Sequence, residues 1–489
     1  MKLPALLEGL ETLAVAGAPH REITAVVCDS RQVRPGALFV AVPGSQQDGS
    51  AYVADALQRG AAAIVQEHPA PPGRREACFV QVPDARRALG RLAAAFHGQP
   101  GAALQLIGIT GTNGKTTCAY MIRELLRAGG RNPGMLTTVE YAIGPRSIPA
   151  RRTTPDAPTL QSLLAQMVSI GCRSAVMEVS SHALDQRRVE GLDFDVAVFT
   201  NLGRDHLDYH RTPEAYFAAK RRLFEDLGGG AKRAWAVYNA DDPWTARLPG
   251  AGEARAAILR YGIAAAADVR AEDLRLGSDG ARFRACTPWG AAEVRLPFLG
   301  RHNVSNALAA ITAAGALGLG PDGAAAALAR LPPVPGRLQP FEAPAGFTVF
   351  VDYAHTADAL ENTLATLRPL TRGQLIVVFG CGGDRDTTKR APMGAVAARL
   401  ADYAILTSDN PRREDPAAIL AQIREGFGDA ARCEAIVDRA AAIRAAVRRA
   451  RPGDIVLVAG KGHETFQEFA STTVPFDDRA VVARELAAL

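Results

Sequence analysis

Residues 104–128 read LQLIGITGTNGKTTCAYMIRELLRA, and this stretch decides how the chain is expected to fold. LQLIGIT is a short apolar run of the kind that forms a buried parallel strand, and CAYMIRELLRA is typical of a helix. The loop between them contains Gly111 and Gly114, which let the backbone wrap closely enough for its N–H groups to point at phosphate oxygens. The positive end of the helix dipole favours the same ligand. The stretch therefore predicts a strand–loop–helix unit that binds phosphate.

The same loop carries side chains suited to ATP and Mg²⁺. Lys115 can reach the β- and γ-phosphates, and the hydroxyl of Thr116 can ligate Mg²⁺. The generic pattern GxxxxGK followed by Ser or Thr is matched imperfectly, because Ile109 stands where the first glycine would be. A glycine-rich turn with an exposed lysine is the alternative interpretation. The loop residues assigned to ATP are Gly111, Thr112, Asn113, Gly114, Lys115, Thr116 and Thr117.

Two stretches rich in proline and glycine divide the chain of 489 residues, a length that suggests about three domains. They are GQPG at 98–101 and PPVPG at 332–336. We therefore predict a smaller N-terminal α/β domain over 1–100, a central domain over 101–336 with a P-loop ATPase-like parallel sheet, and a Rossmann-like C-terminal domain over 337–489. Alternating apolar runs and helix-like stretches predict an α/β fold with helices on both faces of parallel sheets.

Polar clusters follow four apolar runs of the last domain. DYAH (352–355) follows FTVFV, CGGDRD (381–386) follows QLIVVFG, DNPR (409–412) follows AILTS, and KGHE (461–464) follows IVLVAG. In open α/β sheets, ligands bind outside the carboxyl ends of the strands. Four such clusters in succession indicate one binding edge.

Three side chains of the central segment are candidates for metal binding. Glu178 comes near the end of the run SAVMEV and His206 follows the run FDVAVFT, while Mg²⁺ prefers oxygen ligands and keeps several waters. Lys220 lies between Tyr216 and Phe224 on the apolar stripe of a predicted helix. Either this lysine snorkels to the rim of the stripe, or it is a functional lysine with a perturbed pKa.

Composition excludes several classes of protein. The net charge of +5 is too small to indicate nucleic-acid binding, and no apolar stretch is long enough to span a membrane. The seven cysteines are scattered without a zinc spacing, which favours buried free thiols in a reducing compartment. Because the N-terminus does not resemble a signal peptide, we expect a cytoplasmic protein, and we expect it to be a monomer without a nucleic-acid partner.

The phosphate loop and six further motifs occur in a fixed order along the chain: NLGRDHLDYH (201–210), LGRHNVSNALAA (299–310), DYAHTADAL (352–360), GCGGDRD (380–386), DNPR (409–412) and GKGHE (460–464). In this order they resemble the Mur ligase family, and the likeness extends over essentially the whole chain. The resemblance implies that the first domain holds a uridine nucleotide, the central domain holds ATP, and the last domain binds an incoming amino acid.

The resemblance also implies roles for individual residues. Ser30, in CDSR, would contact the UDP moiety, and Lys220 would carry a carbamate (N6-carboxylysine) that ligates metal. The implied metal ligands are Thr116, Glu178, His206 and the Lys220 carbamate, and the implied catalytic residues are Lys115, Lys220 and His206. The residues implied to hold the UDP-muramoyl dipeptide are Thr153, Thr154, Ser180, Gln186 and Arg188. Those implied to extend the ATP site are Asn306, Arg337 and Asp352.

DNPR resembles the branch of the family that selects meso-2,6-diaminopimelate over L-lysine. Diaminopimelate has one more carboxylate than lysine, and a guanidinium can grip that group in bidentate fashion. The residues expected to bind diaminopimelate are Arg385, Asp409, Asn410, Pro411, Arg412, Gly460 and Glu464. Bound lysine is expected to leave the guanidinium of Arg412 without a partner.

The resemblance thus implies an ATP- and Mg²⁺-dependent ligase that adds meso-diaminopimelate to UDP-N-acetylmuramoyl-L-alanyl-D-glutamate through an acyl phosphate. A folylpolyglutamate-forming ligase would share the ATP loop, but it would not explain CDSR or DNPR. A ligase that adds L-lysine would not need the arginine of DNPR, because lysine has no second carboxylate. A non-enzymatic P-loop switch would not explain Glu178, Lys220 and the four strand-end clusters.

Overall fold

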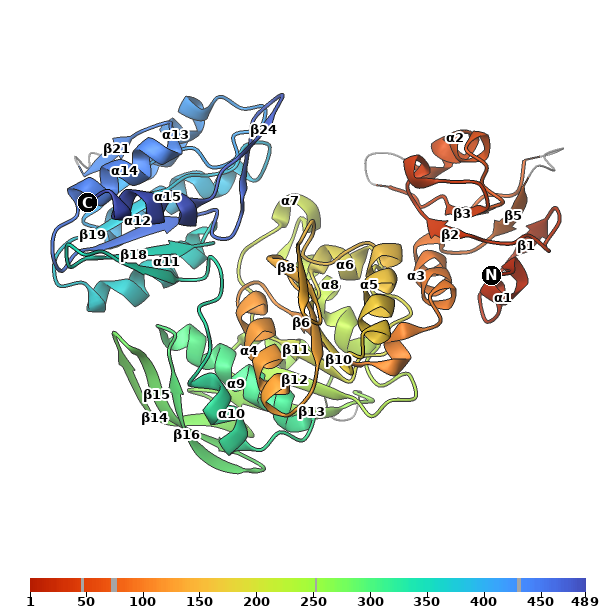
Figure 1. Cartoon of the computed structure of the whole chain (residues 1–489), viewed down its shortest axis with the longest axis horizontal. Coiled ribbons are helices and arrows are strands. Elements are labelled where there is room, and N and C mark those ends of the chain that lie inside the picture. Colours follow the sequence, from red (N-terminus) through yellow and green to blue (C-terminus); the bar gives the residue numbers. More distant parts are fainter. Residues whose placement is uncertain (45–47, 72–76, 251–252, 429–431) are drawn as a thin grey trace.

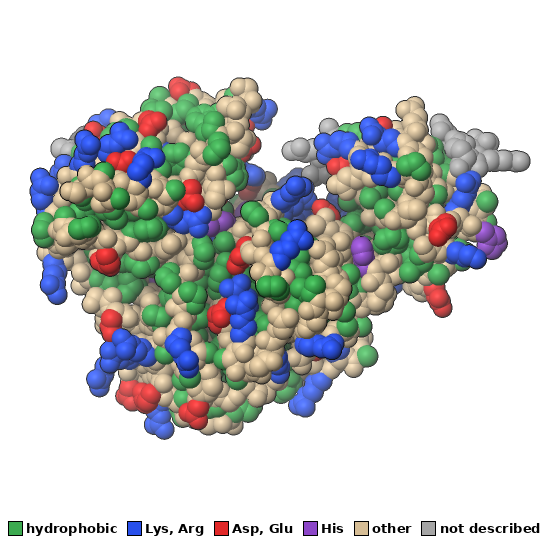
Figure 2. All heavy atoms as spheres, viewed as in Figure 1, with side chains coloured by type: hydrophobic (Ala, Val, Ile, Leu, Met, Phe, Trp, Pro, Cys, Tyr) green, Lys and Arg blue, Asp and Glu red, His purple; other side chains and the backbone are tan. Residues whose placement is uncertain are grey.

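Three large β-sheets, each with its own helices, follow one another along the chain (Figure 1). They are formed by strands within residues 14–81, 105–296 and 339–459. The computed structural model describes residues 1–44, 48–71, 77–250, 253–428 and 432–489. In the space-filling view a hollow separates the N-terminal and C-terminal sheets above the central one (Figure 2). The predicted three-domain α/β architecture is confirmed.

The N-terminal sheet has five strands, of which four are parallel and the first is antiparallel. Its strands lie in the order β1 (Ala14–Ala16), β5 (Cys78–Gln81), β4 (Ala63–Gln66), β3 (Ala37–Val40) and β2 (Ala25–Val27). The helices are α1 (Leu3–Leu7), α2 (Val53–Gln58) and α3 (Ala85–Phe96). Asp84 caps α3 by accepting a hydrogen bond from the amide of Arg87. The guanidinium of Arg87 pairs with Glu190 at 3.0 Å, which fastens α3 to the central domain.

The central sheet has eleven strands around a parallel core. Their order is β16 (Gly290–Leu296), β15 (Gly280–Thr287), β14 (Val269–Gly277), β13 (Ala257–Gly262), β12 (Trp235–Asn239), β11 (Val196–Phe199), β6 (Gln105–Thr110), β10 (Ser174–Glu178), β7 (Pro133–Leu136), β8 (Glu140–Ile143) and β9 (Arg146–Pro149). The helices are α4 (Lys115–Ala128), α5 (Ala157–Ser169), α6 (Ser181–Asp185), α7 (Leu207–His210), α8 (Pro213–Glu225), α9 (Arg301–Ala316) and α10 (Pro321–Leu328).

Successive residues of the core strands point to opposite faces of this sheet, and helices cover both faces. Ile107 and Ile109 of β6 pack with α4, α9 and α10, while Leu106 packs with α5 and α8 on the opposite face. The sequence did not predict the antiparallel strands at the two edges, β8–β9 and β14–β16. On β15, buried Phe283 alternates with exposed Arg282 and Arg284, because helices cover only one face of this extension.

The C-terminal sheet has five parallel strands and one antiparallel edge strand. The order is β17 (Gln339–Glu342), β18 (Thr348–Asp352), β22 (Ile455–Ala459), β19 (Leu375–Phe379), β20 (Tyr403–Leu406) and β21 (Cys433–Ala435), with a separate hairpin of β23 (Phe466–Glu468) and β24 (Thr473–Pro475). Its helices are α11 (Ala357–Leu367), α12 (Arg390–Leu400), α13 (Pro416–Arg424), α14 (Arg439–Arg449) and α15 (Asp478–Ala487). Helices α11–α13 cover one face, and α14 and α15 cover the other. None of the helices in the described residues is long and apolar enough to cross a membrane.

A fully buried ion pair joins α14 to α15 at the carboxyl ends of two strands. Arg439 donates to both carboxylate oxygens of Asp478 at 2.7 Å, and both side chains are completely shielded from solvent. The same guanidinium donates to the carbonyls of Ser408 (3.2 Å) and Ala459 (2.9 Å). These carbonyls immediately precede the DNPR and GKGHE motifs, so the buried pair fixes the backbone from which both motifs begin.

We expect Arg439→Met to destabilise the protein by about 3–5 kcal/mol, because it leaves the Asp478 carboxylate buried without a partner. Urea unfolding followed by circular dichroism measures the loss. Arg444→Met is the matched control on the same helix, since Arg444 is 45% exposed and pairs with Glu485 at the surface, where such pairs contribute about 0–1 kcal/mol. Equal losses in the two variants would show that the buried pair has no special role.

Candidate active site

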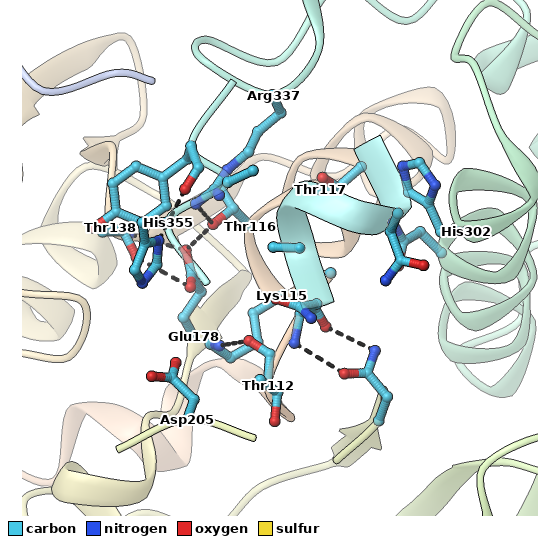
Figure 3. A pocket seen from close by; sticks show the side chains of 18 of the residues that line it. Thr112, Lys115, Thr116, Thr117, Thr138, Glu178, Asp205, His302, Arg337 and His355 are labelled. Carbon is cyan, nitrogen blue, oxygen red and sulfur yellow. Dashed lines mark hydrogen bonds between the residues drawn. The ribbon is translucent and has the colours of Figure 1, made fainter. Parts of the chain in front are cut away.

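A cavity of about 320 Å³ lies where the central and C-terminal domains meet. The phosphate loop forms one side of it, and the beginning of the C-terminal domain forms another (Figure 3). Of the predicted site residues, those that line it are Thr112, Asn113, Gly114, Lys115, Thr116, Thr117, Thr153, Glu178, Ser180, His206, Lys220, Asn306, Arg337 and Asp352. Gly111, Ser30, Thr154, Gln186, Arg188 and the predicted diaminopimelate residues are not among its lining residues.

The phosphate loop has the backbone that its glycines allow. Gly111 has φ +146° and Gly114 has φ +87°, and a Cβ at Gly114 would collide with the side-chain oxygen of Asn306. The amine of Lys115 donates to the carbonyls of Gly111 (2.9 Å) and Thr112 (2.7 Å). Desolvation in the cavity lowers the pKa of Lys115, and the nearby carboxylate of Glu178 opposes that shift. The loop therefore presents a cation and backbone amides to an anionic ligand.

Glu178 lies at the centre of the cavity's hydrogen bonds. It ends β10, is 1% exposed, and accepts from the hydroxyl of Thr116 at 2.8 Å. Thr138 donates to it twice, from its amide at 2.9 Å and from its hydroxyl at 3.1 Å. Arg337 of the C-terminal domain donates to the same Thr116 hydroxyl at 3.0 Å (Figure 3). The carboxylate of Glu178 thus contacts the phosphate loop and the β7–β8 connection directly. Through the Thr116 hydroxyl it is also linked to the C-terminal domain.

Lys220 is buried on the apolar face of α8, with 1% of its surface exposed. Its amine donates to the carbonyl of Gly111 at 2.8 Å and lies 4.3 Å from the ring centre of Tyr216. Burial holds the pKa of Lys220 well below its usual range, and the positive charge of Lys115 lowers it further. Snorkelling to the rim of the stripe is therefore wrong for this lysine.

His206 begins α7 from a left-handed backbone conformation with φ +54°. Its Nε2 lies 3.5 Å from a carboxylate oxygen of Asp205. The centres of the His206 and His182 rings are 4.7 Å apart, and the two rings are nearly perpendicular. Asp205 and Tyr216 also line the cavity. A second polar cluster therefore faces the phosphate loop from the β11–α7 connection.

A row of polar groups leads from Glu178 toward the N-terminal domain. The hydroxyl of Thr154 donates to the carbonyl of Glu178 at 2.9 Å and accepts from the amide of Ser180 at 3.1 Å. Arg188 donates to the carbonyl of Thr154 at 2.9 Å and to the side chain of Gln186 at 2.7 Å. The predicted dipeptide residues of the central domain, with Thr153 bonded to Thr138 at 3.1 Å, are thus brought together. Ser30 lies apart from this row in the N-terminal domain, where it is buried.

The DNPR and GKGHE motifs meet at the carboxyl ends of β20 and β22. Asn410 donates to Glu464 at 3.1 Å, and Lys461 donates to Glu464 at 2.8 Å and to Asn410 at 3.0 Å. Gly460 has φ +113° and lies against the side chain of Asp409. A Cβ added to this glycine would be 2.9 Å from the Asp409 carboxylate. These two motifs therefore lie together at one edge of the sheet, as their positions after the strands predicted.

Arg412 is already paired in this structure. It has φ +52°, its Nε donates to Glu468 at 2.9 Å, and its Nη1 donates to the carbonyl of Gly383 at 2.7 Å. We expected bound lysine to leave this guanidinium without a partner, and in this structure Glu468 of the β23–β24 hairpin already provides one. Pro411 packs against Gly383, and Arg385 is solvent-exposed.

Sequence reasoning missed a clamp between the GCGGDRD and DNPR loops. Arg390, 1% exposed, donates through two nitrogens to the two oxygens of Glu414 at 2.8 and 2.9 Å, and also to the carbonyl of Gly382 at 3.2 Å. Glu414 in turn accepts from the amide of Asp384 at 2.6 Å. It also missed Thr138, which donates to Glu178 from the β7–β8 connection. No local pattern marks any of these residues, because each meets its partner from a distant part of the chain.

Comparison with known proteins identifies relatives along the whole chain. Residues 22–97 match the family described as Mur ligase family, catalytic domain; residues 109–314 match the Mur ligase middle domain; and residues 336–462 match the Mur ligase, glutamate ligase domain. The chain is 48% identical to the UDP-N-acetylmuramyl-tripeptide synthetase of Roseiflexus sp. (strain RS-1), over 100% of this chain and 99% of that protein. It is 47% identical to the UDP-N-acetylmuramoyl-L-alanyl-D-glutamate–2,6-diaminopimelate ligase of Geobacillus kaustophilus, over 98% of both chains.

A solved structure of a UDP-N-acetylmuramoyl-L-alanyl-D-glutamate–2,6-diaminopimelate ligase is similar to this one, with a TM-score of 0.71 and 35% identity. The match covers 100% of this chain and 99% of that chain. Matches to three successive family domains, and relatives at 47% and 48% identity over nearly full length, show that the chain belongs to the Mur ligase family.

Proposed function

We propose that this ligase uses ATP to join meso-2,6-diaminopimelate to UDP-N-acetylmuramoyl-L-alanyl-D-glutamate, a step of peptidoglycan precursor synthesis in the cytoplasm. The observation that carries the proposal is the cavity in which the phosphate loop, Glu178 and Arg337 meet, since it joins the phosphate loop to the domain that holds the DNPR loop. Relatives named for this reaction match the chain from end to end.

The reaction needs a carboxylate to become an electrophile. Transfer of the γ-phosphoryl group of ATP to the γ-carboxylate of the D-glutamate residue forms an acyl phosphate and releases ADP. The amine of diaminopimelate then attacks the acyl carbon, and phosphate leaves from the tetrahedral intermediate. In this scheme Lys115 neutralises charge on the transferred group, and the cavity holds the reactants together and excludes water that would hydrolyse the acyl phosphate.

The residues around the phosphate loop fit Mg²⁺. The Thr116 hydroxyl and the Glu178 carboxylate are hard oxygen donors placed 2.8 Å apart. Within the described ranges, no three His, Cys, Asp or Glu side chains form a group that could hold a metal ion alone. This is the arrangement expected for Mg²⁺, which binds one or two carboxylates together with phosphate oxygens and water. Thr116 and Glu178 would hold the ion, with His206 and Lys220 at a neighbouring position, and the ion would neutralise phosphate charge.

A carbamate on Lys220 is consistent with the chemistry of its surroundings. Carbon dioxide adds to a neutral amine, and burial keeps the pKa of Lys220 well below its usual range, which favours that form. The positive charge of Lys115 that disfavours an ammonium group at this position would favour the anionic carbamate. The modification would convert a buried amine into an anionic oxygen ligand.

The substrates would extend away from this cavity in two directions. The UDP moiety would lie near Ser30 of the N-terminal domain, and the peptide would follow the row of Thr154, Ser180 and Arg188 toward Glu178. Diaminopimelate would approach from the DNPR and GKGHE loops, with Arg412 and Arg385 near its distal carboxylate and Asp409, Asn410, Gly460 and Glu464 around its ammonium group and backbone.

An L-lysine-adding ligase is the second candidate, because Arg412 already has a carboxylate partner in Glu468 and does not need one from the ligand. A phosphate-release assay with the UDP-muramoyl dipeptide and a panel of amino acids tests both candidates. We expect release that depends on meso-diaminopimelate. Release that depends on L-lysine alone would favour the second candidate, and release only with a folate and glutamate would exclude both.

We expect Lys115→Ala to abolish ligation with the fold intact, because the amine stabilises the transferred phosphoryl group. Phosphate release and circular dichroism measure the two properties. Retention of more than about a tenth of the wild-type turnover, a loss of under about 1.4 kcal/mol, would argue against the assigned role.

We expect Lys220→Ala to be nearly inactive and to be partly rescued by a short-chain carboxylic acid that fills the place of the carbamate. Activity with and without added acetate measures rescue, and the intact mass of the wild type measures the modification. Lys232→Ala is a control for loss of another well-packed lysine, which donates to Asp195 at 2.9 Å. A free amine at Lys220 in fully active enzyme would refute the proposal.

We expect Arg412→Ala to reduce the preference for meso-diaminopimelate over L-lysine by about 30-fold, at the lower end of the range for a charged pair, because this arginine is partly exposed and already paired. Arg412→Lys should restore the preference only in part, since an ammonium group does not reproduce the planar fork. The ratio of kcat/KM values for the two amino acids measures the effect. An unchanged ratio in Arg412→Ala would remove Arg412 from the specificity site.

A further inference from the structure

The β23–β24 hairpin is fastened to the DNPR loop by hydrogen bonds in both directions. The amide of Arg412 donates to the carbonyl of Glu468 at 3.0 Å, and the amide of Glu468 donates to the side chain of Asn410 at 3.0 Å. Gln467 donates to the carbonyl of Asp409 at 2.8 Å. Glu468 is therefore held beside Arg412 by its backbone, independently of the ion pair between the two side chains.

The guanidinium of Arg412 is only partly used by the protein. Nε donates to Glu468 and Nη1 donates to the carbonyl of Gly383, whereas Nη2 has no hydrogen-bond partner among the described residues. The side chain of Arg412 is 22% exposed and that of Glu468 is 42% exposed. Arg412 can therefore accept a further carboxylate, but only beside the one that it already holds.

Three other carboxylates around the loop have cations of their own. Asp384 pairs with Arg413 at 2.9 Å, Glu414 pairs with Arg390, and Glu464 pairs with Lys461. In the part of the chain that the structure describes, Glu468 is the carboxylate that forms an ion pair with Arg412. The charge of this residue is therefore the one that a ligand carboxylate at Arg412 would meet.

We propose that Glu468 is a resident counter-ion of Arg412 that limits how strongly this enzyme distinguishes an amino acid with a distal carboxylate from one without it. The proposal rests on the proposed function, in which Arg412 binds the distal carboxylate of diaminopimelate. Binding of that diacid places two carboxylates against one guanidinium, and their repulsion weakens the complex. Binding of lysine leaves the Arg412–Glu468 pair intact, so no unpaired guanidinium penalises it.

Glu468→Gln tests the proposal, because glutamine keeps the length and an acceptor oxygen while removing the charge. We expect the KM for meso-diaminopimelate to fall about three- to tenfold, the scale of a partly exposed charge interaction, with kcat unchanged. The KM for L-lysine should rise or stay constant, so the preference for diaminopimelate should increase. Glu468→Ala should shift the preference in the same direction, although it also removes the acceptor.

Two controls separate this effect from a general loss of an ion pair. Glu361→Gln removes the charge of a surface pair with Arg399 (2.7 Å) in the same domain, and it should change neither KM. In an Arg412→Ala background, Glu468→Gln should have no effect on the preference, because the two side chains act as a pair.

An unchanged or reduced preference in Glu468→Gln would overturn the proposal. So would an equal gain in the Arg412→Ala background. If the wild type used neither amino acid with the UDP-muramoyl dipeptide, the proposed function itself would fail, and the variants would not be needed to show it.

Discussion

The carboxylate of Glu178 is the interaction on which the rest of the site depends. It ends the central strand β10, and it holds the Thr116 hydroxyl of the phosphate loop and both donors of Thr138 at 2.8–3.1 Å. Arg337 binds the same Thr116 hydroxyl from the other side of the domain junction. An almost fully buried carboxylate must have its acceptor sites satisfied. The packing of two domains around Glu178 therefore fixes the position of the phosphate loop.

Neither lysine of the cavity forms an ion pair with a carboxylate in the described part of the chain, although carboxylates line the cavity too. Lys115 and Lys220 both have lowered pKa values, and each donates to the carbonyl of Gly111 rather than to a carboxylate. A polyanion such as a nucleotide triphosphate would supply the missing charge, and a carbamate on Lys220 would reverse the sign of one of the two groups. The same principle operates in the C-terminal domain, where Glu468 neutralises Arg412 before any ligand arrives. Charge balance thus links the proposed ATP and amino-acid sites.

Much of the site could be predicted because its signals are local. The strand–loop–helix sequence specifies the phosphate loop, and the strand ends mark the DNPR and GKGHE loops. The stripe on α8 singles out Lys220, although only the structure shows that its amine is buried and does not reach the rim of the stripe. What could not be predicted depends on pairs that are distant in sequence. Thr138 lies 40 residues from Glu178, and Glu468 lies 56 residues from Arg412. The antiparallel extension β14–β16 was missed because its exposed arginines obscure the buried face in the sequence.

The central claim is that the cavity around Glu178 serves the ATP-dependent addition of meso-diaminopimelate to a UDP-muramoyl dipeptide. The most direct measurement is the mass of the nucleotide product after the enzyme is incubated with ATP, the UDP-muramoyl dipeptide, and equimolar meso-diaminopimelate and L-lysine. The account predicts a product heavier by one diaminopimelate residue, formed with one ADP per molecule. A product that contains lysine, or release of phosphate without any change in the mass of the nucleotide peptide, would contradict it.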